Sequence, residues 1–401
     1  MVDFDTDTDT DTDTDTDTDT DTEDYAAAGS TRFMLSHRLA ERLSSVTGHG
    51  MADPRAVGLI FAPGHAGSWD DARVSGPCVL REPDGSWSMW YYGRDAGFEP
   101  EIPLPTGRCG LARSDDGLNW TRVPGPLASG AVLDPHPDPA RFDSAHVACC
   151  DVTRREGLYW MWHVGGNHHR DRIGQFEVKG LRLMPGCAIS GDGRHWLRID
   201  GPYRGALLDL GAPGEPDMAM IGWPRPLRLP DGRWRLYYHA LDPARMLFVV
   251  CLAESADGLR WQKRGEVLGA GEPGAFDERG IGTRQVIRHG ARWLMFYEGV
   301  SADGHRSIGL AESDDGVAWT RRDGPEPDGS VFAHAPTGSG RWDAFAVGTP
   351  CIVPMPDGSL RLYYVGANET AGGFADELGM VQQIGLAVSD GPDPTRWERY
   401  V

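Results

Sequence analysis

Short runs of alternating hydrophobic and polar residues, each closed by a turn, fill most of the chain from residue 69 onward. The runs are rich in Trp, Tyr, Val and Ile, which favour β-strands, and Asp-Gly turns join many of them as hairpins. The pattern recurs five times. Each copy begins with an aspartate that is followed four residues later by Val or Ile: Asp70, Asp143, Asp217, Asp277 and Asp343. A unit repeated every 60 to 74 residues predicts a radial array of small sheets.

Four strands are predicted in each copy. In the first copy they cover residues 77–81, 87–93, 109–114 and 120–123. We therefore predict an all-β fold, a five-bladed β-propeller of four-stranded antiparallel blades. The blades are expected at about 69–141, 142–215, 216–275, 276–341 and 342–401. The long loops and the starts of the inner strands share one face, so the site is expected at the mouth of the central funnel there.

Residues 1–68 precede the repeat. Asp and Thr alternate over residues 5–22 without an apolar face, so residues 1–31 are expected to form a disordered acidic tail. The spacing of Phe33, Leu35, Leu39 and Leu43 predicts a short amphipathic helix within the segment 32–68. A short strand is expected at 57–61, in the part of this segment that connects to the repeat.

The composition excludes some classes of binding partner. The net charge is -20, but residues 1–31 hold twelve of the 59 acidic residues and none of the 39 basic ones, so the remainder carries 39 minus 47, or -8. A mildly acidic body lacks the basic surface that nucleic acids require. Seven cysteines are scattered along the chain, and those expected in inner strands are Cys78, Cys109, Cys187, Cys251 and Cys351. This pattern indicates buried thiols and a cytoplasmic location. The sequence has no apolar run of membrane-spanning length, so no membrane partner is expected.

The strand pattern, the aspartate before each inner strand and the Ser-Asp-Asp-Gly…Trp signature at 114–120 and 313–319 resemble the arabinanase, levansucrase and invertase superfamily. That superfamily includes glycoside hydrolase families 43, 32, 62, 68 and 130, and the resemblance covers residues 70–401. It implies a sugar or glycoside bound in the funnel and hydrolysed by general acid–base chemistry. Those enzymes usually carry acidic residues deep in the funnel. Here the corresponding positions hold Gly76, Cys149, Trp223, Thr283 and Thr349.

The five repeat aspartates have two interpretations. A glycoside hydrolase uses two carboxylates, so five equivalent ones are expected mainly to support the blades by accepting backbone N–H bonds. In the other interpretation Asp70 and Asp143 are catalytic and Asp217, Asp277 and Asp343 contact the substrate. Several of them together could also hold Ca²⁺. We predict no other metal and no cofactor.

Function is expected where one copy departs from the others. At the end of the second strand, Glu298 and His239 occupy a position that holds Tyr92 in the first copy and Val in the remaining two. His163 replaces a Tyr that the other four copies keep one residue earlier. Glu298, His239 and His163 are therefore candidate acid–base residues, because His titrates near neutral pH and a half-buried Glu can be tuned upward. A hydrogen-bonded core position is the alternative for each histidine.

Further departures lie near the inner strands and in the loops. His146 and Glu278 are additional catalytic candidates. Arg284 stands where other copies have Pro, and needs a buried partner or an anionic ligand. Trp223 is a candidate stacking platform for a sugar. The remaining candidate substrate-binding residues are Arg73, Tyr92, Arg94, His168 and His169.

Three functions fit these patterns. The first is a glycoside hydrolase-like enzyme that acts on a sugar in the funnel. The second is an enzyme of the same fold that catalyses a cyclisation, elimination or rearrangement of a small non-sugar metabolite, and Arg284 suggests an anionic one. The third is a carbohydrate-binding propeller without catalytic activity.

Overall fold

The computed structural model describes residues 53–173, 176–368 and 381–401. The predicted acidic tail and helix, and residues 369–380 of one long loop, lie outside this range. The described residues form an all-β structure of 23 strands with one short 3-10 helix, η1 (Pro54–Ala56). In the same range, no helix is long and apolar enough to cross a membrane.

Three sheets each contain four antiparallel strands. The first consists of β2 (Arg73–Arg81), β3 (Trp87–Arg94), β4 (Arg108–Ser114) and β5 (Thr121–Val123). The second consists of β6 (His146–Arg155), β7 (Leu158–Gly166), β10 (Met184–Ser190) and β11 (Leu197–Ile199). The third consists of β12 (Gly222–Arg228), β13 (Trp234–Asp242), β14 (Leu247–Ser255) and β15 (Gln262–Leu268). These strands match the first three predicted copies.

The last two copies share one nine-stranded sheet. The fourth copy supplies β16 (Ile281–His289), β17 (Arg292–Val300), β18 (Arg306–Ser313) and β19 (Thr320–Arg322). The fifth supplies β20 (Ala346–Pro354), β21 (Leu360–Ala367), β22 (Gln382–Ser389) and β23 (Trp397–Arg399). We predicted separate sheets, but one parallel pair, Arg306 with Ala346, joins β18 to β20.

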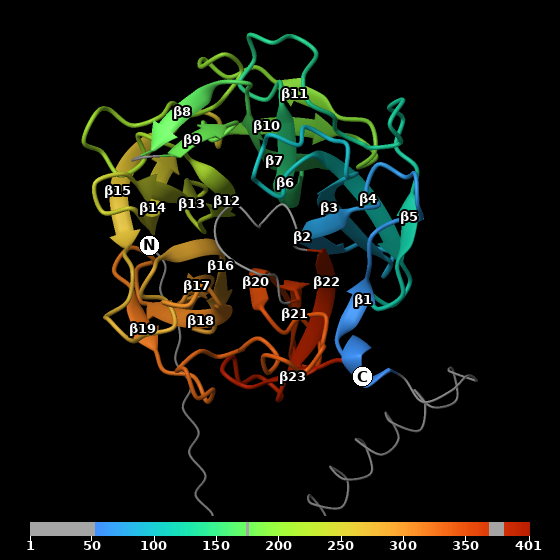
Figure 1. Ribbon diagram of the computed structural model, residues 1–401, viewed down its shortest axis with the longest axis vertical. Helices are drawn as coiled ribbons and strands as arrows, with labels where there is room; N and C mark the ends of the chain where they lie inside the picture. The colour runs from blue at the N-terminus through green and yellow to red at the C-terminus, as the bar shows by residue number, and fades with distance from the viewer. Residues whose placement is uncertain (1–52, 174–175, 369–380) are drawn as a thin grey trace, which may run out of the picture. The chain divides into compact units, whose positions relative to one another are not determined.

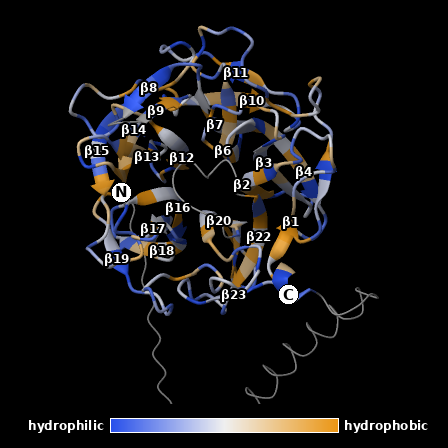
Figure 2. Cartoon of the chain, in the orientation of Figure 1, coloured by the Kyte–Doolittle hydropathy of each residue, from blue (hydrophilic) through white to orange (hydrophobic). Residues whose placement is uncertain are grey.

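The segment before the repeat completes the last sheet. The predicted strand at 57–61 is β1 (Leu59–Phe61), and it pairs with β22. The inner strands β2, β6, β12, β16 and β20 contact one another in succession, and β20 also contacts β2 (Figure 1). Hydrophobic residues concentrate in the strands, whereas the peripheral loops are mostly hydrophilic (Figure 2). The sheets are therefore arranged around a common centre.

Buried hydrogen bonds join neighbouring copies. In each of the first four copies the turn after the third strand is closed by a serine hydroxyl that accepts the N–H of a glycine, as Ser114 does from Gly117 (2.9 Å). In three of these copies the carbonyl of that glycine then accepts a bond from the preceding copy. Tyr237 donates to Gly316 (2.7 Å), and Tyr363 of the last copy donates to Gly117 of the first (2.8 Å). The last bond links residues 246 positions apart in the sequence.

Each repeat aspartate anchors its own sheet. All five are buried, and each accepts a hydrogen bond from an Arg or Lys of the outermost strand, as Asp277 does from Arg321 (2.8 Å). In four copies a tyrosine of the second strand is the other donor, as Tyr297 is for Asp277 (3.2 Å). A cation pairs with each of Asp70, Asp143, Asp217, Asp277 and Asp343, and all except Asp143 also accept a bond from a tyrosine. The main donors are therefore side chains, and not the backbone N–H groups that we predicted.

Two further predictions need correction. The loop at 165–185, expected to be irregular, contains a hairpin of β8 (Arg170–Ile173) and β9 (Phe176–Lys179). All seven cysteines are free and buried, but Cys109, Cys187 and Cys251 lie on third strands and not on inner strands. Their burial fits the prediction of thiols in the core.

Candidate active site

Every inner strand is interrupted by a bulge at the same place. The register shifts lie at Ser75/Cys78, Cys149/Asp151, Gly222/Arg225, Ile281/Arg284 and Gly348/Cys351. These are the positions that hold funnel residues in the superfamily named above. At three of them a residue has a positive φ: Gly76 (59°), Trp223 (42°) and Thr349 (47°). Bulges re-aim side chains, so here residues of the second strand can reach across the inner strands.

Glu298 is the carboxylate held by these bulges. It lies on β17 and is 7% exposed. Its Oε2 accepts a hydrogen bond from the Thr283 hydroxyl (2.8 Å) and one from the backbone N–H of Thr349 (3.1 Å). Its Oε1 pairs with Arg306 (3.3 Å), whose side chain is 23% exposed. All three partners donate, so the Glu298 carboxylate is the acceptor in each of these contacts.

His239 packs beside Trp223 in the adjoining bulge. Their ring centroids are 5.0 Å apart, and the Trp223 indole N–H points to the Tyr92 hydroxyl (3.3 Å). Burial, together with the charge of Arg284, lowers the pKa of His239 to about 3. His239 is therefore neutral at ordinary pH, whereas the sequence led us to expect titration near neutrality. Trp223 is only 7% exposed, so its ring has little surface left for stacking on a sugar.

Arg284 is fully buried (0% exposed) and reaches toward the third sheet. Its guanidinium donates to the backbone carbonyls of Trp223 and of Tyr237 (2.8 Å). Among the described residues its Nε has no hydrogen-bond partner. Burial, with a smaller effect of Arg225, lowers the pKa of Arg284 to about 9. The buried partner expected from the sequence thus consists of backbone carbonyl groups.

The structure brings together five of the predicted site residues. We call Tyr92, Trp223, His239, Arg284 and Glu298 the central cluster. A second carboxylate, Asp151, lies on the inner strand β6, is 16% exposed and pairs with Arg225 (3.5 Å). Burial raises the pKa of Asp151 in spite of this neighbour. The central region therefore combines a glutamate held by three donors, a neutral histidine and two buried arginines.

The other histidine candidates lie apart from the central cluster. His163 takes the tyrosine's place beside its aspartate, with Nε2 3.5 Å from Asp143 Oδ2. Burial lowers the pKa of His163 in spite of Asp143. In His146, Nδ1 contacts the Thr106 hydroxyl (2.7 Å), Nε2 contacts the Gly180 carbonyl (2.9 Å), and burial lowers the pKa to about 4. Proton transfer by His146 would have to break one of these contacts.

The candidate substrate-binding residues of the loops also have protein partners. Arg94 donates to the Ile102 carbonyl (3.2 Å), and burial beside Arg73 lowers its pKa to about 10. His168 and His169 are 45% and 47% exposed and lie near acidic side chains of the same face. They remain candidates for contacts with a ligand at the rim.

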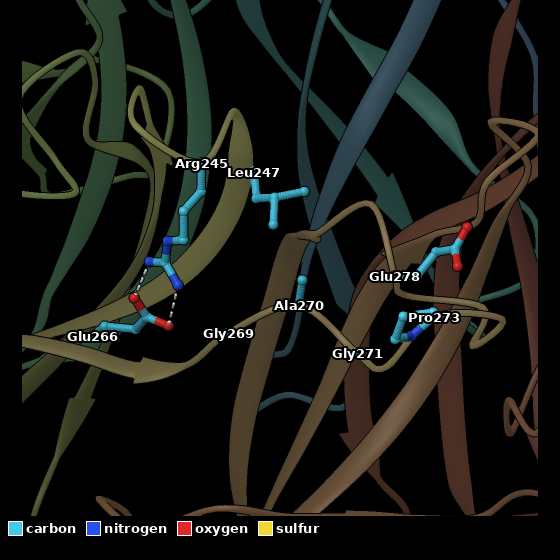
Figure 3. A pocket seen from close by; sticks show the side chains of 8 residues that line it. All are labelled: Arg245, Leu247, Glu266, Gly269, Ala270, Gly271, Pro273 and Glu278. Atoms are coloured by element: carbon cyan, nitrogen blue, oxygen red, sulfur yellow. Dashed lines mark hydrogen bonds and ion pairs between the residues drawn. The ribbon is translucent and has the colours of Figure 1, made fainter.

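Two cavities border the linker before β16. One, of about 510 Å³, has the ion pair of Arg245 with Glu266 on one wall and Glu278 on the other (Figure 3). The second, of about 320 Å³, shares Glu278 and is lined also by His305 and Ser307. Ser307 and Arg306 are adjacent in β18 and point to opposite faces of the sheet. Glu278 therefore lies at a surface cavity, on the other side of β18 from Glu298.

Sequence reasoning missed three residues that contact Glu298: Thr283, Thr349 and Arg306. We noted both threonines only as positions without a carboxylate. A signal was present, since the fourth and fifth copies share a Gly-Thr pair, Gly282-Thr283 and Gly348-Thr349, that the first three copies lack. In the part of the chain that the structure describes, no three His, Cys, Asp or Glu side chains are grouped to hold a metal ion.

The fold is shared with solved carbohydrate-active enzymes. Glycoside hydrolases of family 130, described as targeting β-1,2 mannosidic linkages in Candida mannan, match at 18% identity over 87% of this chain and 98% of theirs (TM-score 0.57). An N-acetylgalactosamine deacetylase from F. plautii, solved with blood group B trisaccharide, matches at 17% identity over 83% and 94% (TM-score 0.59). An α-L-arabinofuranosidase from Lactobacillus brevis matches at 13% identity over 82% and 95% (TM-score 0.57).

These likenesses define a class by fold. The structural neighbours include glycoside hydrolases of propeller-type families, which confirms the predicted resemblance at the level of the fold. No protein-family model matches the sequence, and no curated protein sequence matches it. At such low identities the likeness concerns the fold alone, and the chemistry must be argued from the central cluster.

Proposed function

We propose that this protein is a five-bladed propeller enzyme of the glycoside hydrolase type, in which Glu298 acts on a sugar at the central cluster. The blade count is supported by the five inner strands with equivalent bulges and five aspartate anchors. In this view the nine-stranded sheet is two blades, since only one residue pair, Arg306 with Ala346, joins its halves. A sugar ligand is supported by the resemblance to enzymes that act on glycans.

One observation carries the proposal: the carboxylate of Glu298 accepts hydrogen bonds from three donors at the inner bulges. A carboxylate can act as a base, or stabilise the positive charge of an oxocarbenium-like transition state. Its Oε1 faces Arg306, which is partly exposed, whereas Oε2 is enclosed by threonines. A bound sugar would therefore meet Oε1.

A second candidate function is a non-hydrolytic acid–base reaction of a small metabolite. Glycoside hydrolysis requires a second carboxylate that acts as an acid. Among the residues described, the inner strands carry one carboxylate, Asp151, which is partly buried and engaged with Arg225. Proton abstraction by Glu298, with buried Arg284 nearby, would need no second carboxylate. This observation favours a cyclisation, elimination or rearrangement.

The test compares two glutamates that are equally buried. Glu298→Gln removes the proposed catalytic carboxylate, whereas Glu82→Gln removes a carboxylate of the same exposure (7%) that bonds Ser88 and Tyr159. Purified full-length variants are incubated with a panel of aryl glycosides and oligosaccharides. Reducing ends report hydrolysis, and proton NMR reports any other conversion. We expect E298Q to lose at least about 100-fold in kcat, while E82Q stays within about threefold of the parent.

Each result has a definite reading. If conversion without new reducing ends is observed, the second function replaces the first. If E298Q keeps full activity on a substrate that the parent converts, or if the parent binds glycans of the panel but converts none, the proposed role of Glu298 is wrong.

A further inference from the structure

Glu298 belongs to the fourth copy, but the fifth copy helps to hold its carboxylate. Thr283 comes from the bulge of β16, in the same copy, and Thr349 from the bulge of β20, in the next copy. Both direct a hydrogen to Oε2 of Glu298, at 2.8 and 3.1 Å. The carboxylate therefore spans the boundary between two inner strands.

The Thr283 hydroxyl takes part in two hydrogen bonds, and this determines in which of them it donates. The backbone N–H of Thr349 also donates to the Thr283 hydroxyl oxygen (2.9 Å). A hydroxyl has a single hydrogen. Because Thr283 already accepts from Thr349, its own hydrogen is free to point at Glu298. A short relay thus runs from the Thr349 N–H through the Thr283 hydroxyl to Oε2.

The backbone beside these hydrogen bonds allows the Glu298 carboxylate to approach closely. Thr349 has φ +47°, a conformation that a β-branched residue rarely adopts. Such strain is typically retained at functional sites. A Cβ added to Gly348 would lie 2.1 Å from Oε2, and one added to Gly282 would lie 3.0 Å from Oε1. The two Gly-Thr pairs therefore combine a close approach with two donors.

The two carboxylate oxygens of Glu298 have different neighbours. Arg306 pairs with Oε1, and among the described residues Arg284 and Tyr92 are the other titratable groups near the carboxylate. Both arginines are cationic, and burial keeps the Tyr92 hydroxyl protonated by raising its pKa. Oε2 accepts from both threonine donors and is enclosed. In the part of the chain that the structure describes, Oε1 has only Arg306, which is partly exposed.

We infer that Thr283 and Thr349 are positioning residues that hold Oε2 of Glu298 with two hydrogen bonds and leave Oε1 as the oxygen that takes a proton from the substrate or from water. In that step the O–H bond of the donor breaks and an O–H bond to Oε1 forms. The catalytic meaning of this assignment rests on the proposed function, but the effect of the threonines on the ionisation of Glu298 does not.

The experiment removes one donor at constant shape. Thr283→Val deletes the hydroxyl, Thr283→Ser retains it, and Thr106→Val deletes an equally enclosed hydroxyl that bonds His146. In protein labelled with ¹³C at glutamate carboxyl groups, the Glu298 signal is assigned by its absence in E298Q. We expect its protonation midpoint to rise by about one pH unit in T283V and to stay unchanged in T283S and T106V. Thr283→Ala serves if T283V does not fold.

A kinetic measurement follows the same variants. The acidic limb of the kcat profile of T283V should move upward with the NMR midpoint, with little change in KM, and T283S should restore it. An unchanged NMR midpoint in folded T283V or T283A overturns the inference, even if E298Q is inactive. A shifted midpoint in a protein that converts no substrate supports the threonine assignment and rejects the proposed function.

Discussion

Replacing Tyr297 by Phe removes one of the two side-chain donors to the Asp277 carboxylate. Asp277 is fully buried (0% exposed), with Tyr297 Oη at 3.2 Å and Arg321 Nε at 2.8 Å. A hydrogen bond to a charged group contributes about 1.5–3 kcal/mol. The distance is long for an O–H donor, so we expect Y297F to lower the free energy of unfolding by about 1.5 kcal/mol. In the first copy, Tyr91 lies 2.9 Å from Asp70, so Y91F should cost more, about 2 kcal/mol.

Urea unfolding followed by tryptophan fluorescence and by circular dichroism measures these losses. Tyr203→Phe is the control, because Tyr203 is 40% exposed; its change should stay within about 0.5 kcal/mol. Arg321→Lys extends the test, since Lys263 already fills the equivalent place beside Asp217 (2.8 Å). We expect R321K to lower the free energy of unfolding by about 1 kcal/mol, because the guanidinium bond to the Gly269 carbonyl is lost. If Y297F matches the control in stability but loses turnover, the anchor interpretation of the aspartates is wrong and a catalytic one is required.

Three further predictions test burial and packing. Stability should fall between pH 7 and pH 5, because burial lowers the pKa of His146 to about 4 while the unfolded chain keeps about 6.5, so the unfolded state takes up the proton first. His146→Gln should remove about 2 kcal/mol of this pH dependence, measured by urea unfolding at both pH values; an unchanged slope would show that His146 is not buried as a neutral group. Gly348→Ala places a Cβ 2.1 Å from Glu298 Oε2, so it should lower the free energy of unfolding by about 1–3 kcal/mol and reduce activity. Gly191→Ala is the control, because its Cβ meets nothing within 4 Å, and it should change neither stability nor activity. Equal behaviour of the two variants would contradict the close approach. The seven free, buried cysteines should react with a thiol reagent only after unfolding, and rapid reaction of the native protein would count against their burial.

The repeat allowed much of the fold to be predicted, because its hairpin turns and aspartates recur in every copy. Partners distant in the sequence were not predicted. The pairing of β1 with β22 and the bridge between Arg306 and Ala346 depend on how the sheets meet, which no local pattern encodes. The cationic partners of the aspartates were visible but overlooked. An Arg or Lys stands two residues after a Trp in each copy: Arg122, Arg198, Lys263, Arg321 and Arg399.

The candidate site was only partly predictable for a different reason. Glu298, His239 and Arg284 stood out as departures from the repeat, and the structure places them in one cluster. Their protonation could not be deduced from the sequence, since the pKa of His239 is set by burial and by Arg284. The contribution of Thr283 and Thr349 was missed because one donates through a hydroxyl and the other through its backbone N–H. Only the conformation at the bulges makes these groups converge.

The repeat also explains why variation can accumulate at the bulges. Each sheet is anchored near the start of its inner strand by an aspartate and a cation, and this pair is present in all five copies. The anchor tolerates limited exchange, with His163 for tyrosine in the second copy and Lys263 for arginine in the third. The bulge lies beyond the anchor, so its residues can differ between copies without loss of the anchor. In the fourth and fifth copies that freedom has produced two Gly-Thr pairs around one glutamate. We therefore expect substitutions at the anchors to act through stability, and substitutions around Glu298 to act through chemistry.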